Sequence, residues 1–474
     1  MAKPPVTPPV ASALGRFLTL AGTATRIGGG LLGQGLRPGR SGIDWQPVGD
    51  LLGEVLGQMK GPVLKLGQQA SQWQGVLPEP ISRALTRLQN RVPALPFSAL
   101  RGHLQQVYGA DLGQFFQQID EQPFAAASLG QVHRAVALDG RALVLKVQYP
   151  GIAEICAADL RQLRRLLPLG RLFRAPAKQL EGVYQELVAV ISAELDYPAE
   201  MQRLQRFRQH FADWPGLRLP QPQEDLCRPG VLALSEEAGL PFAEVSQARA
   251  EVRERLALTL VRWLSAQAFE LGLLHADPHP GNFAYTAAGE LVVYDFGCVQ
   301  TLSAELLAAY TQTYQALQAR DGEQLESAFQ ALGTRQPQST TPYGLYRQLH
   351  GLLGPLLQPG AHWDFAATPL HQQVQALLPD VLGALGSLQP APATLLVNRT
   401  LEGHYWNLNR LAVALPLADL LHERVLDRLG VPYVDWSAQL PCNRAVAVPC
   451  ASVPGGRGRA GDMSMGAPGS VSGS

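Results

Sequence analysis

The sequence predicts an α+β protein of two lobes, a small β-rich lobe followed by a larger helical one. Residues 131–148 alternate apolar and polar side chains around an Asp-Gly dipeptide, the pattern of a β-hairpin. Apolar residues at helical spacing follow over 152–212 and again over 250–272. From 302 to 430 the chain is rich in Leu and Gln and predicts further helices. With 474 residues, 46% of them hydrophobic, the chain is long enough for a two-lobed core.

Charge, cysteine content and hydropathy limit the classes of protein to which the chain can belong. Its formal net charge is +0, which argues against a nucleic acid held by a basic field. Its 5 cysteines are scattered and odd in number, as expected in a reducing compartment. No run approaches the ~18 apolar residues of a membrane span. We therefore expect a cytoplasmic protein whose contacts with the inner face of a membrane are peripheral.

The most informative stretch is GLLHADPHPGNFAY, residues 272–285. Asp277 is followed five residues later by Asn282, and a short β-branched run then ends in the triplet D-F-G, which begins at Asp295. Phosphoryl transfer in kinases needs a carboxylate near the attacking hydroxyl, and an Asn and a second Asp that hold Mg²⁺ against the phosphates. The kinase catalytic loop has the same Asp–Asn spacing and is followed by D-F-G. The spacing therefore predicts Asp277 as the base or water-orienting group, and Asn282 and Asp295 as metal ligands.

Two other interpretations of this stretch have to be weighed. His275 and His279 are four residues apart, so a helix could present both to zinc. However, Pro278 and Pro280 forbid a regular helix here, and no third ligand stands nearby in the sequence. The stretch could also be a structural turn whose backbone is set by Pro and Gly. The zinc site and the structural turn both lose support, because the other half of a nucleotide site can be found upstream in the sequence.

That upstream half begins with Lys146, which lies in the second strand of the predicted hairpin. A lysine in an apolar strand is usually at an edge or faces solvent, but a kinase keeps its phosphate-binding lysine on such a strand. The helix predicted over YQELVAVISAELDYPAE offers Glu186, Glu194 and Asp196 as partners, of which we take Glu194. Because these elements precede the Asp–Asn loop and D-F-G in kinase order, the sequence predicts a bilobal protein-kinase-like fold.

The loop AAASLGQ stands where a kinase has its Gly-rich flap. It predicts nucleotide contacts from Ala125, Ala126, Ala127, Ser128 and Gln131. Alanine narrows the accessible backbone conformations, so this flap should be stiffer than a glycine flap. The catalytic loop reads H-A-D rather than H-R-D, and no A-P-E segment follows D-F-G. Peptide substrates therefore have no obvious docking platform, and we expect that proteins are not phosphorylated.

With these motifs the sequence resembles the UbiB-like (AarF-domain) atypical kinases over residues 45–440. LKLGQQASQWQGVLPEPISRALTRLQNRVP is similar to the family's K-x-G-Q region, AAASLGQVHRA to its Ala-rich loop and ELDYPAE to its E-x-D motif. LKVQYPGI, LLHADPHPGNF and D-F-G complete the resemblance. The K-x-G-Q, Ala-rich and H-x-D-P-H-P-G-N motifs are specific to the family. One departure is Ser235, at a position of the interlobe hinge where the family usually has an acidic residue.

The resemblance implies ATP and Mg²⁺ as cofactors, and weak ATPase or small-molecule kinase chemistry tied to isoprenoid quinone synthesis and membrane lipids. The implied partners are a small-molecule, lipid or quinone-precursor ligand and a homodimer or biosynthetic complex. One alternative is a nucleotide-gated scaffold for a quinone-biosynthesis complex, without turnover; retention of Asp277, Asn282 and Asp295 favours chemistry over it. Another is a small-molecule phosphotransferase of the aminoglycoside or choline type, which would not explain the K-x-G-Q and Ala-rich segments.

Lys65 belongs to the K-x-G-Q region and shares one face of a predicted helix with Gln68, three residues away. By itself this spacing describes a solvated basic face. The resemblance implies instead that the helix packs over the catalytic cleft. We therefore expect Lys65 to reach the cleft as a further catalytic residue and to pair with Glu194, Asp196 or Asp295.

Composition and motifs divide the chain into five segments. The first is a flexible or amphipathic leader, and the last is a tail rich in Gly, Ser, Pro and Ala that we expect to be disordered. Between them lie the K-x-G-Q helical extension, a kinase-like N-lobe with a helical insert, and a helical C-lobe. In chain order the five segments are 1–45, 46–110, 111–234, 235–440 and 441–474.

Overall fold

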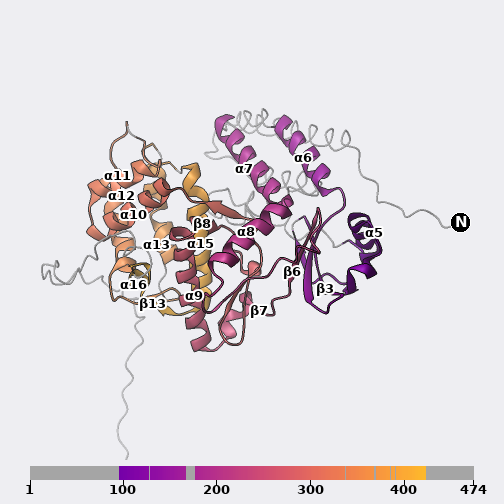
Figure 1. Ribbon diagram of the computed structural model, residues 1–474. Helices are drawn as coiled ribbons and strands as arrows, with labels where there is room; N and C mark the ends of the chain where they lie inside the picture. The colour runs from indigo at the N-terminus through magenta and orange to yellow at the C-terminus, as the bar shows by residue number, and fades with distance from the viewer. Residues whose placement is uncertain are drawn as a thin grey trace, which may run out of the picture. The chain divides into compact units, whose positions relative to one another are not determined.

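The computed structural model describes residues 95–127, 129–166, 177–336, 338–367, 370–384, 386–389 and 391–422. All of them belong to the larger of the chain's two compact units, Met1–Val434. They form an antiparallel sheet with a helix packed on it, followed by a mainly helical region (Figure 1). The expected α+β fold, with a β-rich N-lobe and a helical C-lobe, is confirmed. The leader, the tail and the extension up to residue 94 lie outside the described residues.

The N-lobe is built on an antiparallel sheet in the order β1-β3-β4-β6, with β2 also paired to β3. The predicted hairpin is confirmed as β3 and β4, and Gly140 in its turn has a φ of 87°, which favours glycine. Because β6 pairs with the other side of β4, that strand is central in the sheet. The strands are β1 Phe116–Ile119, β2 Ala125–Ala127, β3 Gly130–Ala137, β4 Ala142–Gln148 and β6 Val231–Ser235.

Helix α5, Phe97–Tyr108, packs on one face of this sheet. Leu100, Leu104 and Tyr108 recur at helical spacing and are buried against β4 and its neighbours. The Tyr108 hydroxyl donates a 2.6 Å hydrogen bond to the Leu226 carbonyl, so its polar end is satisfied inside this core. The helix ends at Gly109, with a φ of 67°, and η1, Leu112–Gln114, leads into β1. The end of the segment assigned to the extension is therefore part of the N-lobe core.

Three helices follow β4, and they confirm the helical character predicted for 152–212 wherever that range is described. They are α6 Ile152–Leu166, α7 Ala177–Leu195 and α8 Tyr197–His210. Figure 1 shows α6 and α7 side by side, with α8 continuing from α7. The helix is interrupted at Asp196, between α7 and α8. The Asp196 carboxylate accepts a 3.0 Å hydrogen bond from the Ala199 N–H and caps α8. Pro198 lies in the first turn of the new helix, where its missing N–H costs nothing.

The core of the C-lobe surrounds α9, Ala250–Phe269, within the predicted 250–272 helix. Its Leu256, Leu260 and Trp263 are fully buried against two small sheets and the helices around them. One sheet has the order β5-β10-β9-β7, and in the other β11 pairs with β8. These elements are β5 Leu217–Arg218, β7 Leu240–Pro241, η3 Phe242–Gln247, β8 Leu273–His275, η4 Pro280–Asn282, β9 Phe283–Tyr285, β10 Leu291–Val293 and β11 Val299–Thr301.

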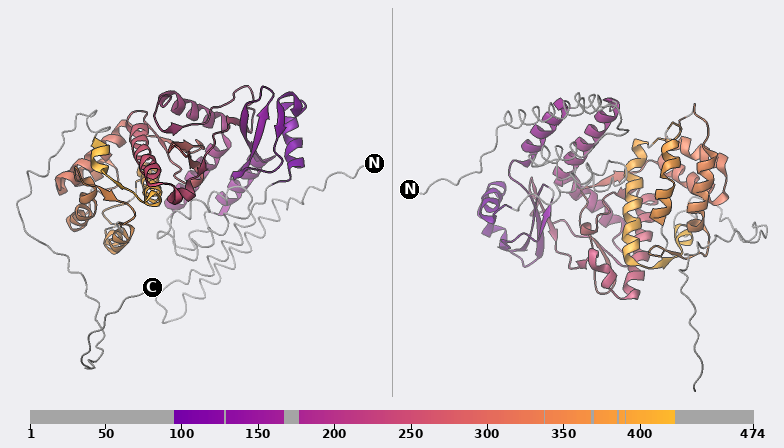
Figure 2. Two further views of the ribbon diagram at one scale, coloured as in Figure 1. Left: turned by 90° about the horizontal axis from the view of Figure 1, so that it is seen from below. Right: turned by 180° about the vertical axis from the view of Figure 1, so that it is seen from behind.

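The rest of the described chain is mainly helical, as predicted for 302–430. Its long helix α15 is yellow-orange in the view from behind in Figure 2 and packs against α9 and η3. The elements are α10 Ala304–Ala319, α11 Gly322–Ala331, α12 Tyr343–Leu353, η5 Gly354–Leu357, β12 Trp363–Asp364, α13 Leu370–Ala376, α14 Leu378–Gly383, α15 Pro392–Leu411, β13 Ala414–Leu415 and α16 Leu417–Leu421.

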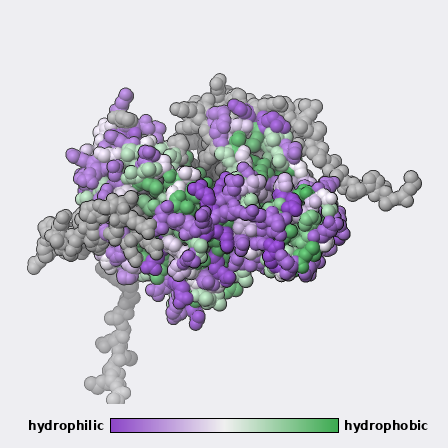
Figure 3. All heavy atoms as spheres, viewed as in Figure 1, coloured by the Kyte–Doolittle hydropathy of each residue, from purple (hydrophilic) through white to green (hydrophobic). Residues whose placement is uncertain are grey.

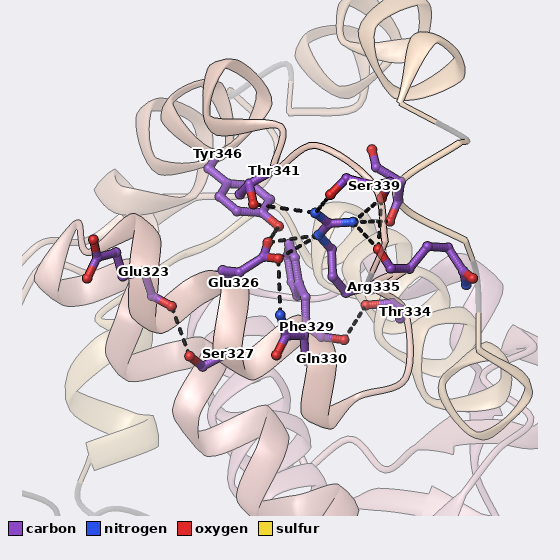
Figure 4. Close-up of polar contacts among 12 residues, drawn as sticks. Glu323, Glu326, Ser327, Phe329, Gln330, Thr334, Arg335, Ser339, Thr341 and Tyr346 are labelled. Atoms are coloured by element: carbon purple, nitrogen blue, oxygen red, sulfur yellow. Dashed lines mark hydrogen bonds and ion pairs between the residues drawn. The ribbon is translucent and has the colours of Figure 1, made fainter.

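A buried arginine holds part of this helical region together. Figure 4 shows the Arg335 guanidinium between Glu326, whose carboxylate lies 2.7 Å from Nε, and the backbone and hydroxyls of the following loop. Arg335 donates to the carbonyls of Gln336, Ser339 and Ser387, and the Tyr346 hydroxyl donates to Glu326. Its side chain is 1% exposed. The charge is therefore compensated where α11, α12, the loop between them and the segment after α14 meet.

The surface is mixed in character. On the face seen in Figure 3, hydrophobic residues form patches separated by hydrophilic ones. Within the described ranges, no helix combines the length and the apolar character needed to cross a membrane.

Candidate functional site

Lys146 lies inside the N-lobe on the central strand β4, so it is neither an edge residue nor solvent-facing. Its register partners are Val132 on β3 and Leu232 on β6. Its ammonium contacts both carboxylate oxygens of Glu200, at 2.9 and 3.0 Å, and one oxygen of Asp295 at 3.2 Å. The side chains of Lys146 and Glu200 are 10% and 2% exposed. A lysine from the sheet, a glutamate from α8 and the aspartate of D-F-G therefore meet in one nearly buried cluster.

The sequence had led us to expect Glu194 as the partner of Lys146. In the structure the partner is Glu200 instead. The physical reason is the helix break at Asp196. Glu194 lies near the end of α7, whereas Glu200 lies in the first turn of α8, the helix that packs next to β6. Glu194 still acts on Lys146 through space, as one of the groups that raise its pKa. Asp196 caps α8, and the side chain of Glu186 lies outside the described part of the chain.

Burial and charge act on this cluster in opposite directions. Burial alone would lower the pKa of Lys146, but the carboxylates of Asp295 and Glu200 outweigh it and hold that pKa well above its ordinary value. Burial raises the pKa of Glu200 to about 7, against the opposing effect of the Lys146 ammonium. The ammonium also lies 5.2 Å from the centre of the Tyr197 ring, a cation–π contact. Lys146 therefore keeps its positive charge inside the protein.

Asp295 is fixed by its own triplet and by α8. One carboxylate oxygen accepts a 2.8 Å hydrogen bond from the Gly297 N–H, and the other faces Lys146. Arg203, one turn beyond Glu200 on α8, donates a 3.0 Å hydrogen bond to the Gly297 carbonyl. A Cβ on Gly297 would lie 3.0 Å from the Asp295 carboxylate, so a larger residue here would crowd that group. Asp295 is 35% exposed on its side chain and stays accessible to a ligand.

The H-A-D-P-H-P-G-N stretch is a compact loop between β8 and β9. The Asn282 amide donates a 3.2 Å hydrogen bond to the Asp277 carbonyl, so the predicted base and the predicted metal ligand are tied together. His279 accepts from the Gly281 N–H at 3.1 Å. Asp277 and Asn282 are both half-buried. The loop therefore presents a carboxylate and an amide from one rigid turn.

His275 does not act with His279 as a metal-binding pair. Its Nε2 lies 2.5 Å from the Asp295 carbonyl, which can only accept, so this nitrogen carries a proton. Burial lowers the pKa of His275, which keeps the ring neutral. The ring packs against Phe296 of D-F-G, 5.3 Å between centroids, and against Phe283. In the described part of the chain, no group of three or more His, Cys, Asp or Glu side chains could hold a metal ion.

Asn282 and Asp295 lie at the same end of the β9–β10 pair. Phe283 pairs with Val293, and the Tyr294 N–H donates a 3.0 Å hydrogen bond to the Asn282 carbonyl. Because Asn282 directly precedes this pairing and Asp295 follows it by two residues, the amide of one and the carboxylate of the other come from neighbouring backbone. Their oxygens are hard ligands of the kind that Mg²⁺ prefers. The residues therefore fit the metal that the kinase pattern implies.

In the Ala-rich flap, the nucleotide contact predicted for Gln131 is wrong. Ala125, Ala126 and Ala127 form β2, and Ser128 lies outside the described residues. Gln131 is fully buried; its amide accepts from the Leu95 N–H at 2.8 Å and donates to the Leu95 carbonyl at 3.3 Å.

The strand register explains this correction. Gln131 faces Val147 on the side of the sheet covered by α5, whereas Val132 pairs with Lys146 on the opposite side. Successive residues of β3 point to opposite faces, so Gln131 points away from the cluster around Lys146. Ala125, the flap residue paired with Val132, is exposed. The flap contacts of Ala125, Ala126, Ala127 and Ser128 stay predictions.

Sequence reasoning missed several residues that shape the site. Glu200 could have been found by taking Pro198 as the start of a new helix, which places Glu200 in its first turn. Arg203 then follows on the same face. Gly403 and Asn407 of α15, which contact the loop after Asp277, gave no local signal. Lys65 lies outside the described residues, so its predicted place in the cleft stays a prediction.

The fold and this cluster define a protein of the kinase-like class. The chain belongs to the ABC1 atypical kinase-like family, whose domain description, "ABC1 atypical kinase-like domain", matches residues 87–329. The resemblance found in the motifs is thereby confirmed.

Individual relatives agree with this assignment. The chain is 27% identical to the atypical kinase COQ8B, mitochondrial, of Rattus norvegicus over 87% of this chain and 80% of that protein. It is 32% identical to a Marinobacter nauticus protein named "Probable protein kinase UbiB", over 58% of this chain and 52% of that protein. The chain spans about half the length, or less, of several relatives that it matches.

A solved structure supports the fold. The structure titled as the complex of Rv3197 with erythromycin, from Mycobacterium tuberculosis, superposes with a TM-score of 0.56 and 26% sequence identity. The superposition covers 80% of this chain and 95% of that one.

Proposed function

We propose that the protein is an ATP-binding atypical kinase or ATPase of the UbiB type, which supports isoprenoid quinone biosynthesis or membrane lipid homeostasis. The observation that carries this proposal is the ion-paired cluster of Lys146, Glu200 and Asp295, on three separate elements of a kinase-like fold. The names of the rat and Marinobacter relatives, which both contain the word kinase, support the same class.

Each residue of the site has a role in this proposal. Lys146, held by Glu200, binds phosphate oxygens of the nucleotide. Asn282 and Asp295 hold Mg²⁺, which when bound neutralises negative charge on the phosphates. Asp277 accepts the proton of the attacking group or orients a water molecule. Because Asn282 is hydrogen-bonded to the Asp277 backbone, the carboxylate of Asp277 keeps a set position relative to the metal ligands.

The acceptor in this proposal is a small molecule, a lipid or water. After Gly297 the chain enters β11, which pairs with β8, and α10 begins at Ala304. This short connection leaves no long segment on which a peptide could be aligned. It supports phosphoryl transfer to an acceptor that enters the cleft by itself.

Two variants test the proposal. Thermal stabilisation by MgATP or MgADP should disappear in Asp295→Asn, because the amide lacks the negative charge with which the Asp295 carboxylate would hold Mg²⁺. Asp277→Asn should keep that stabilisation but lose about 10² to 10⁴-fold in turnover, the usual contribution of a general base. An Asp295→Asn variant stabilised as strongly as the wild type would show that the metal assignment is wrong.

The acceptor and the scaffold alternative are tested by hydrolysis assays. ATP hydrolysis should be measured with and without anionic liposomes and quinone-precursor phenols. Stimulation that depends on Asp277 would support the enzyme and identify the class of acceptor. Tight MgATP binding without any Asp277-dependent hydrolysis would contradict the enzyme proposal and favour the nucleotide-gated scaffold.

A further inference from the structure

Helix α15 touches the catalytic loop immediately after each of its two predicted chemical residues. Asn407 donates a 2.9 Å hydrogen bond to the carbonyl of Pro278, which follows Asp277. His404 packs edge-on against the ring of Phe283, which follows Asn282, with 5.6 Å between ring centroids. Both α15 side chains are 1% exposed. The helix therefore contacts the loop at both ends of the Asp–Asn spacing.

Gly403 makes the close approach of α15 to the loop possible. A Cβ at this position would lie 2.7 Å from the Cβ of Pro278 and closer still to its Cγ. A proline ring cannot rotate away, so any larger residue would push the loop and the helix apart. Glycine weakens a helix interior, and here its use is explained by the contact. Gly403, His404 and Asn407 are spaced so that they share one face of α15.

This contact comes from outside the matched family domain. The ABC1 description ends at residue 329, whereas α15 begins at Pro392. Asn407 and Pro278 are 129 residues apart in the chain. Within the loop, the Asn282 amide is bonded to the Asp277 carbonyl, so a shift of Pro278 would move both residues together.

We propose that α15 positions the catalytic loop, and that Gly403 and Asn407 are positioning residues that set the places of Asp277 and Asn282. The roles of Asp277 and Asn282 rest on the proposed function; the contact itself does not. The helix acts through the loop backbone, because Asn407 bonds the Pro278 carbonyl and Gly403 lies against the Pro278 ring.

The first test measures the loop without nucleotide. Hydrogen exchange of the Gly281 and Asn282 amides should be about tenfold faster in Gly403→Ala than in the wild type, because overpacking strains the contact. The control is Gly351→Ala on α12, where an added Cβ meets nothing within 4 Å. The control should leave these amides within twofold of the wild type.

A second pair of variants tests the hydrogen bond. Asn407→Ala should also speed exchange at Gly281 and Asn282. Asn409→Ala is the matched control, because the Asn409 amide donates a similar 2.7 Å hydrogen bond to the Phe365 carbonyl, outside the loop. In a double-mutant cycle, Pro278→Ala should reverse part of the Gly403→Ala effect, since it removes the ring that the added methyl would meet.

Turnover separates positioning from packing. In Gly403→Ala and Asn407→Ala, kcat should fall about 10 to 100-fold and the Mg²⁺ requirement should rise, while nucleotide affinity without metal changes less than twofold. Exchange at the loop amides equal to the wild type in both variants would overturn the inference. So would uniformly faster exchange across the C-lobe with unchanged kcat per folded molecule. If the wild type itself hydrolyses no ATP, the proposed function fails, and the exchange data alone decide the inference.

Discussion

Replacing Glu200 by Gln tests the assignment of the lysine's partner. The substitution keeps the shape of the side chain and removes its charge. Lys146 then retains Asp295 as its nearest carboxylate, at 3.2 Å and on a side chain that is 35% exposed. The Lys146 side chain is only 10% exposed. The variant therefore leaves a nearly buried positive charge with a weaker, more solvated partner.

The cost follows from the charge left behind. Removing one partner of a buried ion pair destabilises a protein by about 3 to 5 kcal/mol. Because Asp295 remains and Gln still accepts one hydrogen bond, we expect the lower end, about 3 kcal/mol. Glu194→Gln is the comparison, since Glu194 lies on α7 and raises the pKa of Lys146 less than Asp295 and Glu200 do. It should destabilise the protein less than Glu200→Gln does.

The assay is urea unfolding at pH 8, where Glu200, with a pKa of about 7, is ionised in the wild type. The midpoint should shift while the slope stays constant, which reports a change in stability alone. MgATP turnover should also fall at least about tenfold in Glu200→Gln, because the lysine–glutamate pair must be in place for phosphoryl transfer. Equal destabilisation by the two substitutions, or a larger effect of Glu194→Gln, would refute the assignment of Glu200.

Three further predictions concern other parts of the molecule. Burial lowers the pKa of His404 to about 3 in the folded protein. The unfolded chain therefore binds a proton at His404 more readily, and the free energy of unfolding falls as the pH drops below 6.5. Between pH 7 and pH 5 the wild type should lose about 2 kcal/mol more than His404→Asn, and equal losses by urea unfolding would contradict this. Arg335→Leu should cost about 3 to 5 kcal/mol in the same assay, because it leaves Glu326 uncompensated, whereas the exposed Arg347→Leu should cost less than about 0.5 kcal/mol. Generic peptides should receive no labelled phosphate, and transfer that depends on Asp277 would disprove that expectation.

Several features followed from local sequence alone. The hairpin around Asp139-Gly140 is set by a turn that needs a positive φ and by alternation along two strands. The spacing from Asp277 to Asn282 marks a loop between strands, because proline and glycine exclude a helix there. The kinase-like class follows from the order of such short motifs. None of these conclusions needs knowledge of which distant segments touch.

Contacts between distant segments were decided only by the tertiary structure. Lys146 had several acidic neighbours in sequence order, and the capped break at Asp196 made Glu200 its partner, 54 residues away. Gln131 was assigned to the nucleotide until the register placed it on the α5 side of the sheet. The contact between α15 and the catalytic loop gave no local sequence pattern. The need for glycine at position 403 becomes visible only when Pro278, on the opposing loop, is in place.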